Sequence, residues 1–281
     1  MRCWCRCRNS ADADKLFNKS ASILAAEHGG TPSINLGKTI YFTGTNTGVG
    51  KTVAAAATLR LARRHAVRCA GLKPIATGGA RAAPGGPLRN GDALELQASG
   101  SLALDYDTVN PFCFEPAIAP HLAARDTGTS LDLPRLVTWL QGAAPEAQLR
   151  VVEGVGGWRV PLYPAGYTSD LPEALALDVI LVVGLTLGCL NHARLTLEAI
   201  ERGGRCRLAG WIANAVDPTF ERSEDNVGSL TDLLGVPPAA QIPHLDATPR
   251  SPFGNPVHEF ADDAASLLAA LGVLAPPRRL V

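Results

Sequence analysis

The sequence predicts an α/β domain with a mostly parallel sheet and helices on both faces. Short, near-continuous apolar runs such as Thr39–Thr43 and Val179–Val183 alternate with longer segments of helical periodicity. Strands that are apolar on both sides are typical of a parallel sheet that helices cover on both faces. The 281 residues are enough for one such domain with a sizeable core.

The elements follow one another from Lys38 onward. The predicted strands are Thr39–Thr43, Val67–Leu72, Leu149–Val152, Val179–Val183, Ala209–Ala213 and Ala240–Ile242. The predicted helices are Lys51–Arg64, Asn191–Arg202, Glu221–Leu234 and Val257–Leu271. In the first helix, apolar residues recur on one face at helical spacing, namely Val53, Ala56, Ala57 and Leu61. The segment Thr77–Gly91 contains five glycines and two prolines, and we expect a long functional loop there.

The chain divides by composition into an extension, a domain and a tail. Residues 1–36 show no core-facing periodicity, so we expect a disordered or loosely attached extension. Its cysteines, Cys3, Cys5 and Cys7, could ligate a metal, although their spacing matches no common zinc pattern. We expect one domain over residues 37–272 and a C-terminal tail over residues 273–281.

Charge and hydropathy exclude two classes of partner. The 26 basic and 26 acidic residues give no net charge, so no bulk field exists to hold nucleic acid or an anionic membrane. The longest apolar run, Val179–Leu190, has twelve residues, whereas a membrane-spanning helix needs about 18 or more. Seven cysteines are an odd count for a disulfide framework, and no secretory signal is visible, which favours a reducing cytoplasm.

A glycine-rich segment between the first strand and the first helix is typical of a phosphate-binding loop. It runs from Gly44 through Gly50 to Lys51 and Thr52. Its backbone N–H groups and the helix N-terminus would attract phosphate. Lys51 would reach the outer phosphates, and the Thr52 hydroxyl would hold Mg²⁺. Five residues separate the two glycines instead of four, so the loop is a variant. An ordinary strand-to-helix turn is the less favoured alternative.

Charged side chains follow the next predicted strands. Lys73 follows the second strand and Glu153 the third. Because parallel strands deliver their carboxyl ends to one edge, Lys73 could face the same crevice as Lys51, or it could be a solvated lysine. Glu153 could complete a Mg²⁺ site, since Mg²⁺ takes few protein ligands and favours carboxylates, or it could be a surface residue. Asp92 could join that site or simply cap the next helix.

Two further positions could bind ligand groups. The segment Gly188–Asn191 precedes a helix whose free N–H groups make a second anion site, although Asn191 could be a plain N-cap. Asn214 ends a strand and offers both a donor and an acceptor to an adenine edge, or it could form a turn. Cys189 has no suitably spaced histidine, so a cysteine nucleophile is not indicated.

Together these motifs resemble the dethiobiotin synthetase family, ATP-dependent enzymes of biotin synthesis. The resemblance is carried by TGTNTGVGKT at 43–52, GLKPIATG at 71–78, RNGDA at 89–93, DYDTVNPFCFEPAIAPHLAA at 105–124, VVEGVGGWRVPL at 151–162, VILVVGLTLGCLNHARLT at 179–196 and LAGWIANAV at 208–216. It covers roughly residues 38–270 in the family's order, and the five-residue gap is the family's form. It implies a single-domain fold like that of P-loop NTPases.

The resemblance implies a reaction and a role for each residue. The substrates would be 7,8-diaminononanoate, CO₂ and ATP, joined through a carbamate and its mixed anhydride with phosphate. Nucleotide contacts would come from Thr47, Gly48, Val49, Gly50, Lys51, Thr52, Val53, Asn214 and Pro243. Catalysis would use Lys51 and Lys73, and Mg²⁺ would be held by Thr52, Asp92 and Glu153. The diamine would meet Thr47, Lys73 and Thr77, and its carboxylate would meet Gly188, Cys189, Leu190 and Asn191 from the other subunit of a homodimer.

Some residues depart from the family pattern. Family members often carry an acid where Asn46 and Gly48 stand, and Arg250 stands where an acid would contact ribose. One alternative is a switch ATPase of the partitioning or septum-placement type, but such proteins usually carry an extra lysine early in the loop, which residues 44–50 lack. A cobalamin-type amide synthase would need a glutaminase domain, for which no length remains.

Overall fold

A computed structural model describes residues 37–162 and 166–244 of the chain. Residues 1–36, with the three clustered cysteines, lie outside this part, as do Arg250 and the predicted helix Val257–Leu271. The four cysteines in the described part, Cys69, Cys113, Cys189 and Cys206, are all free thiols. No helix within residues 37–162 and 166–244 is long and apolar enough to cross a membrane.

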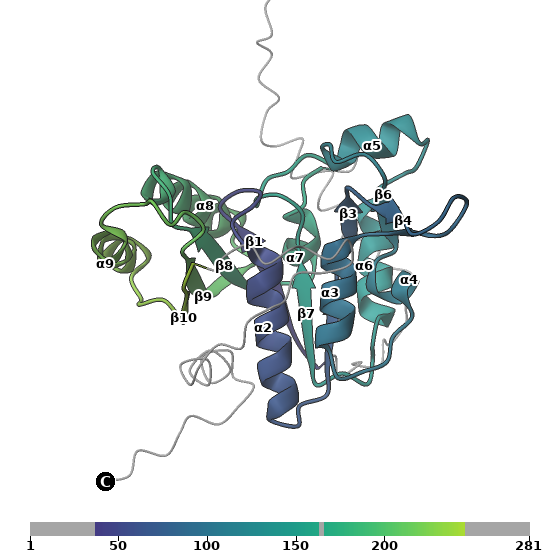
Figure 1. Cartoon of the computed structure of the whole chain (residues 1–281), viewed down its shortest axis with the longest axis horizontal. Coiled ribbons are helices and arrows are strands. Elements are labelled where there is room, and N and C mark those ends of the chain that lie inside the picture. Colours follow the sequence, from purple (N-terminus) through teal and green to yellow (C-terminus); the bar gives the residue numbers. More distant parts are fainter. Residues whose placement is uncertain (1–36, 163–165, 245–281) are drawn as a thin grey trace, which may run out of the picture. The chain divides into compact units, whose positions relative to one another are not determined.

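Six parallel strands form the central sheet, as the sequence predicts (Figure 1). They are β1 (Lys38–Gly44), β2 (Cys69–Leu72), β7 (Leu149–Glu153), β8 (Asp178–Gly184), β9 (Arg207–Asn214) and β10 (Ala240–Ile242). Their order across the sheet is β10-β9-β8-β1-β7-β2, with every neighbouring pair parallel. The chain therefore crosses from one side of β1 to the other, and such a switch point is where ligands bind in open α/β sheets.

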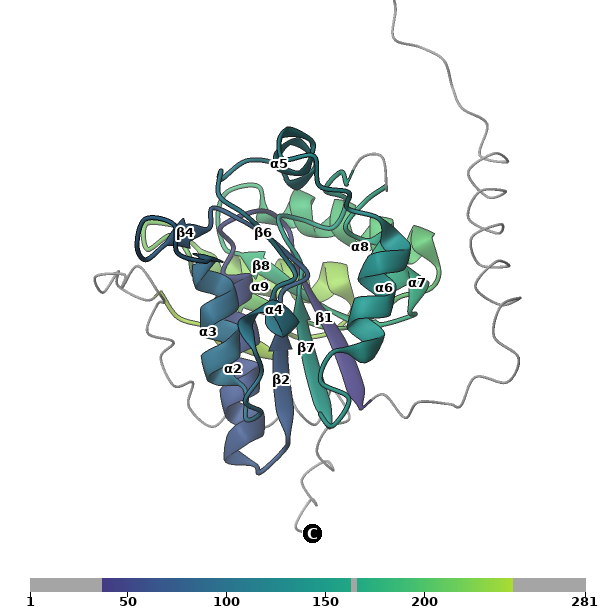
Figure 2. The ribbon, with the colours of Figure 1, turned by 90° about the vertical axis from the view of Figure 1, so that its right-hand side faces the viewer.

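Helices cover both faces of the sheet, which confirms the predicted fold class (Figure 2). On one face α2 (Lys51–Arg64) and α3 (Gly91–Ser99) pack against β1, β2 and β7. The opposite face carries α6 (Leu133–Gly142), α7 (Asp170–Ala174) and α8 (Cys189–Gly203), with α9 (Ser223–Leu234) packed on α8. Alternate side chains of β1 pack on opposite faces of the sheet, since Ile40 and Phe42 belong to one buried cluster and Tyr41 belongs to the other.

The segment Thr77–Gly91 was expected to be a long loop without structure, and this expectation is wrong. Its first residue ends β3 (Ile75–Thr77), which pairs in parallel with β6 (Phe112–Phe114), and within it β4 (Ala80–Arg81) pairs antiparallel with β5 (Leu88–Arg89). Strands of two or three residues are too short to show alternation in a sequence. The helices α4 (Tyr106–Val109) and α5 (Pro120–Asp126) are also too short to show a clear helical periodicity, and the sequence did not predict them.

Two helix starts differ from expectation. Helix α8 begins at Cys189, two residues before the predicted start, because Gly188 takes a left-handed φ of 95° and serves as the N-cap. Asn191 is therefore not the N-cap. Helix α3 is capped by Asn90, whose side chain accepts a hydrogen bond from the Ala93 N–H at 3.2 Å, so the alternative role of Asp92 as cap is also wrong. Asp92 is free to point elsewhere.

Candidate active site

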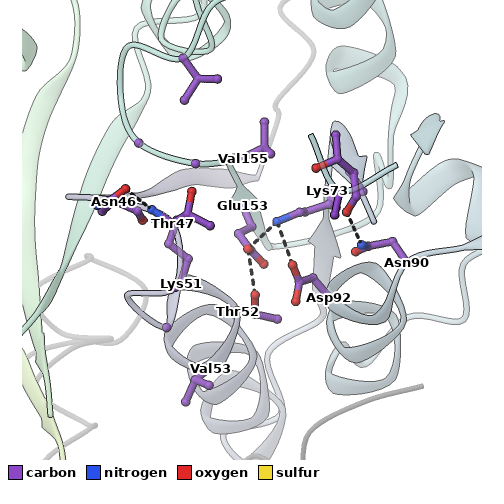
Figure 3. Close-up of a pocket in the computed structure, with 18 of the residues that line it drawn as sticks. Asn46, Thr47, Lys51, Thr52, Val53, Lys73, Asn90, Asp92, Glu153 and Val155 are labelled. Atoms are coloured by element: carbon purple, nitrogen blue, oxygen red, sulfur yellow. Dashed lines mark hydrogen bonds and ion pairs between the residues drawn. The ribbon is translucent and has the colours of Figure 1, made fainter. Parts of the chain in front are cut away.

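A cavity of about 860 Å³ opens at the carboxyl edge of the sheet, around the loop that follows β1 (Figure 3). Its walls come from the β1–α2 loop, the ends of β3 and β9, the start of α3, the segment before α5 and the loop after β7. The lining residues are Asn46, Thr47, Gly48, Gly50, Lys51, Thr52, Val53, Lys73, Ala76, Thr77, Asn90, Asp92, Ala117, Ile118, Ala119, Pro120, Glu153, Val155, Gly156, Gly157, Val160, Asn214, Ala215, Val216 and His244.

The conformation of the β1–α2 loop is fixed by a glycine and two hydrogen bonds. Gly50 has a φ of 86°, and a Cβ there would lie 2.0 Å from Asn214 Nδ2, so the position requires glycine. The amide of Asn214 donates to the Val49 carbonyl at 2.9 Å, which fixes the loop to the end of β9. Lys51, the first residue of α2, curls back and donates from Nζ to the Asn46 carbonyl at 3.0 Å. The lysine is thereby held over the loop.

Lys73 lies between two carboxylates on the other side of the cavity (Figure 3). Its Nζ is 2.5 Å from Glu153 Oε1 and 3.5 Å from Asp92 Oδ2. The Thr52 hydroxyl donates to the same Glu153 oxygen at 2.9 Å. The side chains of Lys73 and Glu153 are only 4% and 1% exposed, so the alternatives of a solvated lysine and a surface glutamate are both wrong.

The two lysines of the cavity differ in their electrostatics. Burial, followed by the charge of Lys73, lowers the pKa of Lys51 to about 8. Burial alone would also lower the pKa of Lys73, but the charges of Glu153 and Asp92 outweigh it and raise that pKa. Burial would raise the pKa of Asp92, but the positive charge of Lys73 outweighs it and lowers that pKa instead. Lys73 and Asp92 are therefore charged at neutral pH.

The acidic side of the cavity offers oxygen atoms of the kind that Mg²⁺ takes as ligands. Glu153 Oε2 is buried and has no hydrogen-bond partner, which is unusual for a buried carboxylate. The Thr52 hydroxyl and Asp92 also line the cavity beside it. No group of three or more His, Cys, Asp or Glu side chains suited to a metal occurs in the described part of the chain. Two carboxylates and a hydroxyl suit Mg²⁺, which also takes phosphate oxygens and water.

The cavity brings most of the predicted site residues together, but not all of them. Thr47 and Thr77 line it, whereas the side chain of Val49 is buried in the core and its carbonyl accepts a hydrogen bond from Asn214. Pro243 is exposed and does not line the cavity, although the next residue, His244, does. The segment Gly188–Asn191 lines no part of it either.

Several lining residues were missed from the sequence. Asn90 is one of them, and it both caps α3 and donates from Nδ2 to the Thr77 carbonyl at 3.1 Å. An asparagine near the start of a helix is an N-cap signal, but Asp92, two residues later, carries the same signal. The apolar wall, which includes Ile118, Val155 and Val160, carries no motif of its own and is assembled only by folding.

Comparison with known proteins identifies the family. A family model described as an AAA domain matches residues 38–251. The ATP-dependent dethiobiotin synthetase BioD of Pseudomonas aeruginosa (strain UCBPP-PA14) is 50% identical over 211 residues, which cover 74% of this chain and 91% of that protein. The chain belongs to the dethiobiotin synthetase family. BioD of Cellvibrio japonicus is 42% identical, over 75% of this chain and 97% of that protein. The predicted family is confirmed, and the chain is a ligase.

Solved structures show a more distant likeness. A ParA family ATPase from Chlorobium tepidum TLS has a TM-score of 0.45 and 15% identity, covering 75% of this chain and 86% of that chain. The MinD cell division protein of Aquifex aeolicus has a TM-score of 0.45 and 14% identity, covering 74% and 83%. The parallel sheet and its strand order, rather than these likenesses, establish the fold class.

Proposed function

We propose that this dethiobiotin synthetase uses ATP and Mg²⁺ to convert 7,8-diaminononanoate and CO₂ into dethiobiotin, ADP and phosphate. The observation that carries the proposal is the convergence of two buried lysines and two carboxylates around one cavity. The described lining of that cavity contains no serine or cysteine. Phosphorylation of a carbamate needs no protein nucleophile, so this set of side chains suits it.

The proposed chemistry has three steps. One amine of the substrate adds to CO₂ and loses a proton, which gives a carbamate. A carbamate oxygen takes the γ-phosphoryl group of ATP, and ADP leaves. The second amine then attacks the carbamoyl carbon, phosphate leaves, and the ureido ring closes. The protein has to position these groups and neutralise the charge on the transferred phosphoryl group.

Each lysine has a separate part in this scheme. Lys51, held over the loop, would bind the outer phosphates of ATP. Lys73 would contact the carbamate and the transferred phosphoryl group, where its positive charge stabilises charge that develops during transfer. Glu153 supports that role because its carboxylate favours the protonated lysine. Thr52, Asp92 and Glu153 would hold Mg²⁺, which when bound neutralises the phosphate oxygens.

The nucleotide base and the diamine would lie at opposite ends of the cavity. Asn214 uses one amide N–H on Val49, so its second N–H and its Oδ1 remain to read adenine. Pro243 would lie beside the base, because the next residue, His244, lines the cavity. Thr47 and Thr77 would line the diamine site next to Lys73, together with the apolar wall that suits the methylene chain.

We further propose that a second copy of the chain completes each site. The segment Gly188–Asn191 lies outside the cavity of its own chain, yet it begins a 15-residue helix with free N–H groups that suit a carboxylate. Leu187, just before the helix, is 93% exposed, and Leu195, on the helix itself, is 56% exposed. Large apolar side chains this exposed are typical of an interface, and a two-fold dimer would cover them.

The proposed reaction is tested by the dependence of ADP formation on both substrates. ADP release should require diaminononanoate and bicarbonate together. Carbon from ¹³C-bicarbonate should then appear in the ring carbonyl of dethiobiotin, as measured by mass spectrometry. ATP hydrolysis that proceeds equally well without either substrate would contradict the proposal and favour a switch ATPase.

The shared site is tested by mixing two inactive variants, Lys51→Ala and Gly188→Trp. If sites are shared, a mixed dimer regains one intact site of two, and random pairing makes about half of the dimers mixed. Refolding the two variants together at equal amounts should therefore restore about a quarter of wild-type activity. If each chain builds its own site, no activity returns.

A further inference from the structure

We infer that Tyr106 and Asn110 are positioning residues of this enzyme, joined in one buried hydrogen-bond relay that sets Lys73 relative to the start of α3. Neither side chain lines the cavity. The inference rests on the proposed roles of Lys73 and Asp92, and it adds the residues that fix the positions of these two groups relative to each other.

The relay begins at the backbone of Lys73. The Asn110 side chain donates from Nδ2 to the Lys73 carbonyl at 2.6 Å, and the Lys73 N–H donates to the Val109 carbonyl at 2.8 Å. Both backbone polar groups of Lys73 are therefore held by the residues at the end of α4. Asn110 is 3% exposed and also donates to the Phe112 carbonyl at 3.1 Å, so its amide has little freedom.

The relay continues through Tyr106 to α3. The Tyr106 hydroxyl donates to Asn110 Oδ1 at 2.9 Å and accepts the Asn90 N–H at 2.7 Å. Asn90 caps α3 with its side-chain oxygen and holds the Thr77 carbonyl with its amide. Asp92 lies two residues further along the first turn of the same helix. One hydroxyl group thus connects the catalytic lysine to the helix turn that carries the carboxylate beside it.

The surroundings of Tyr106 keep the relay in place. The Arg89 guanidinium stacks on the Tyr106 ring at 4.0 Å from its centre, which closes that side of the ring. Trp139 donates from Nε1 to the Thr108 carbonyl at 3.1 Å and holds α4 against α6. This second contact fixes the same short helix without touching Lys73, Asn90 or Asn110, so it provides a matched control.

The functional consequence follows from the geometry of phosphoryl transfer. Lys73 has to meet a group whose charge develops only during transfer, and misplacement by about 1 Å can cost on the order of 10²-fold in rate. Nucleotide binding depends on different contacts, because the phosphate-binding loop is held by Lys51 on Asn46 and by Asn214 on Val49. Loss of the relay should therefore slow turnover and leave nucleotide affinity nearly unchanged.

Tyr106→Phe removes only the hydroxyl and is the primary test. Its kcat should fall about 10-fold or more, while the Kd of a non-hydrolysable ATP analogue, measured by calorimetry, should stay within about twofold. Asn110→Ala should lower kcat further. Trp139→Phe should lower the melting temperature about as much as Tyr106→Phe and keep the wild-type kcat. A Tyr106→Phe enzyme with wild-type kcat, or with equal losses of kcat and of nucleotide affinity, would overturn the inference.

A double variant separates positioning from general damage. If the relay acts through Lys73, then Lys73→Ala combined with Tyr106→Phe should be no slower than Lys73→Ala alone, because coupled residues are not additive. Multiplied losses in the double variant would overturn the inference and leave the proposed function intact. A Lys73→Ala enzyme with normal turnover would instead refute the proposed role of Lys73 and the relay with it.

Discussion

The two sides of the cavity are built in different ways. The phosphate-binding loop is a run of consecutive residues, 44–52, between one strand and one helix, and its lysine contacts a carbonyl of the same loop. The opposite side joins Lys73, Asp92 and Glu153 from three separate parts of the chain, and the lysine lies 80 positions before the glutamate that it contacts. Binding of phosphate is therefore a local property, whereas the reacting groups depend on the whole fold.

The two lysines of the cavity also differ in the charges around them and in their pKa values. Both are buried, at 6% and 3% exposed, yet their pKa values shift in opposite directions. Lys73 has Glu153 and Asp92 beside it, whereas Lys51 contacts a neutral carbonyl and, among the described residues, has no carboxylate within ion-pair distance. Within the described part of the chain, Lys51 thus has no carboxylate in direct contact, which suits an anionic ligand, whereas the raised pKa of Lys73 keeps it charged at neutral pH.

The largest expected effect comes from the acidic side. Glu153→Gln should reduce turnover by about 10² or more, since it removes the buried carboxylate that pairs with Lys73 and would hold Mg²⁺. It should also destabilise the fold by up to about 3 kcal/mol, because the buried lysine loses its nearest counterion. Asp92→Asn, at a half-exposed side chain, should affect stability much less.

Steady-state kinetics over a Mg²⁺ titration and denaturant unfolding measure these effects. Glu95→Gln is the matched control, because Glu95 is also a buried acid but pairs with Arg60 at 2.7 Å outside the cavity. This control should lose stability and keep its kcat. Normal turnover of both active-site variants at limiting Mg²⁺ would contradict the metal assignment.

The second prediction separates the two lysines. Lys73→Ala should lower kcat by about 10² and leave ATP affinity nearly unchanged, because its partner charge develops only in the transition state. Lys51→Ala should weaken ATP binding by about 10-fold or more and slow transfer as well. Calorimetric titration with ATP and single-turnover measurements of each variant test the split. A Lys73→Ala enzyme that loses ATP affinity but keeps its turnover rate would contradict it.

The third prediction uses the lowered pKa of Lys51, which is about 8. Below that pH the free enzyme carries a protonated Lys51, which favours bound phosphate. Above it the amine is neutral, so ATP affinity should fall as pH rises, by at most about tenfold per pH unit. Bound phosphate should raise the same pKa, so binding above pH 8 should take up a proton. Calorimetry in buffers of different ionisation enthalpy measures this uptake, which should vanish in Lys51→Ala.

The smallest expected effect is at Asn214, whose side chain either only holds the loop or also binds adenine. Asn214→Ala removes the hydrogen bond to Val49 and, if the side chain also reads the base, the preference for adenine. The KM for ATP should rise several-fold, and the preference for ATP over GTP should fall, since each good base contact is worth about 1–3 kcal/mol. An equal rise in KM for both nucleotides would show that Asn214 only holds the loop.

The sheet and the phosphate-binding loop can be predicted from local patterns in the sequence. Strands buried on both faces need near-continuous apolar runs, and helix α2 starts at Lys51 and ends at Arg64 as its alanine-rich pattern predicts. The phosphate-binding loop could be predicted because its glycines, lysine and threonine lie close together in the chain. The motifs also placed Lys73, Asp92 and Glu153 at or just after strands and loops, in the order of the dethiobiotin synthetase family.

Only the tertiary structure decided how these residues meet. The sequence left Lys73 and Glu153 open between a site and a solvated surface, and their contact depends on burial where β2 and β7 lie side by side. The relay through Tyr106 and Asn110 joins residues from different elements by hydrogen bonds that no local pattern signals. The earlier start of α8 depends on the left-handed backbone of Gly188, which glycine permits but does not require. The Lys73–Glu153 contact and the relay arise from pairing between distant segments, which the spacing of residues along a chain does not encode, whereas the start of α8 is set by the local backbone at Gly188.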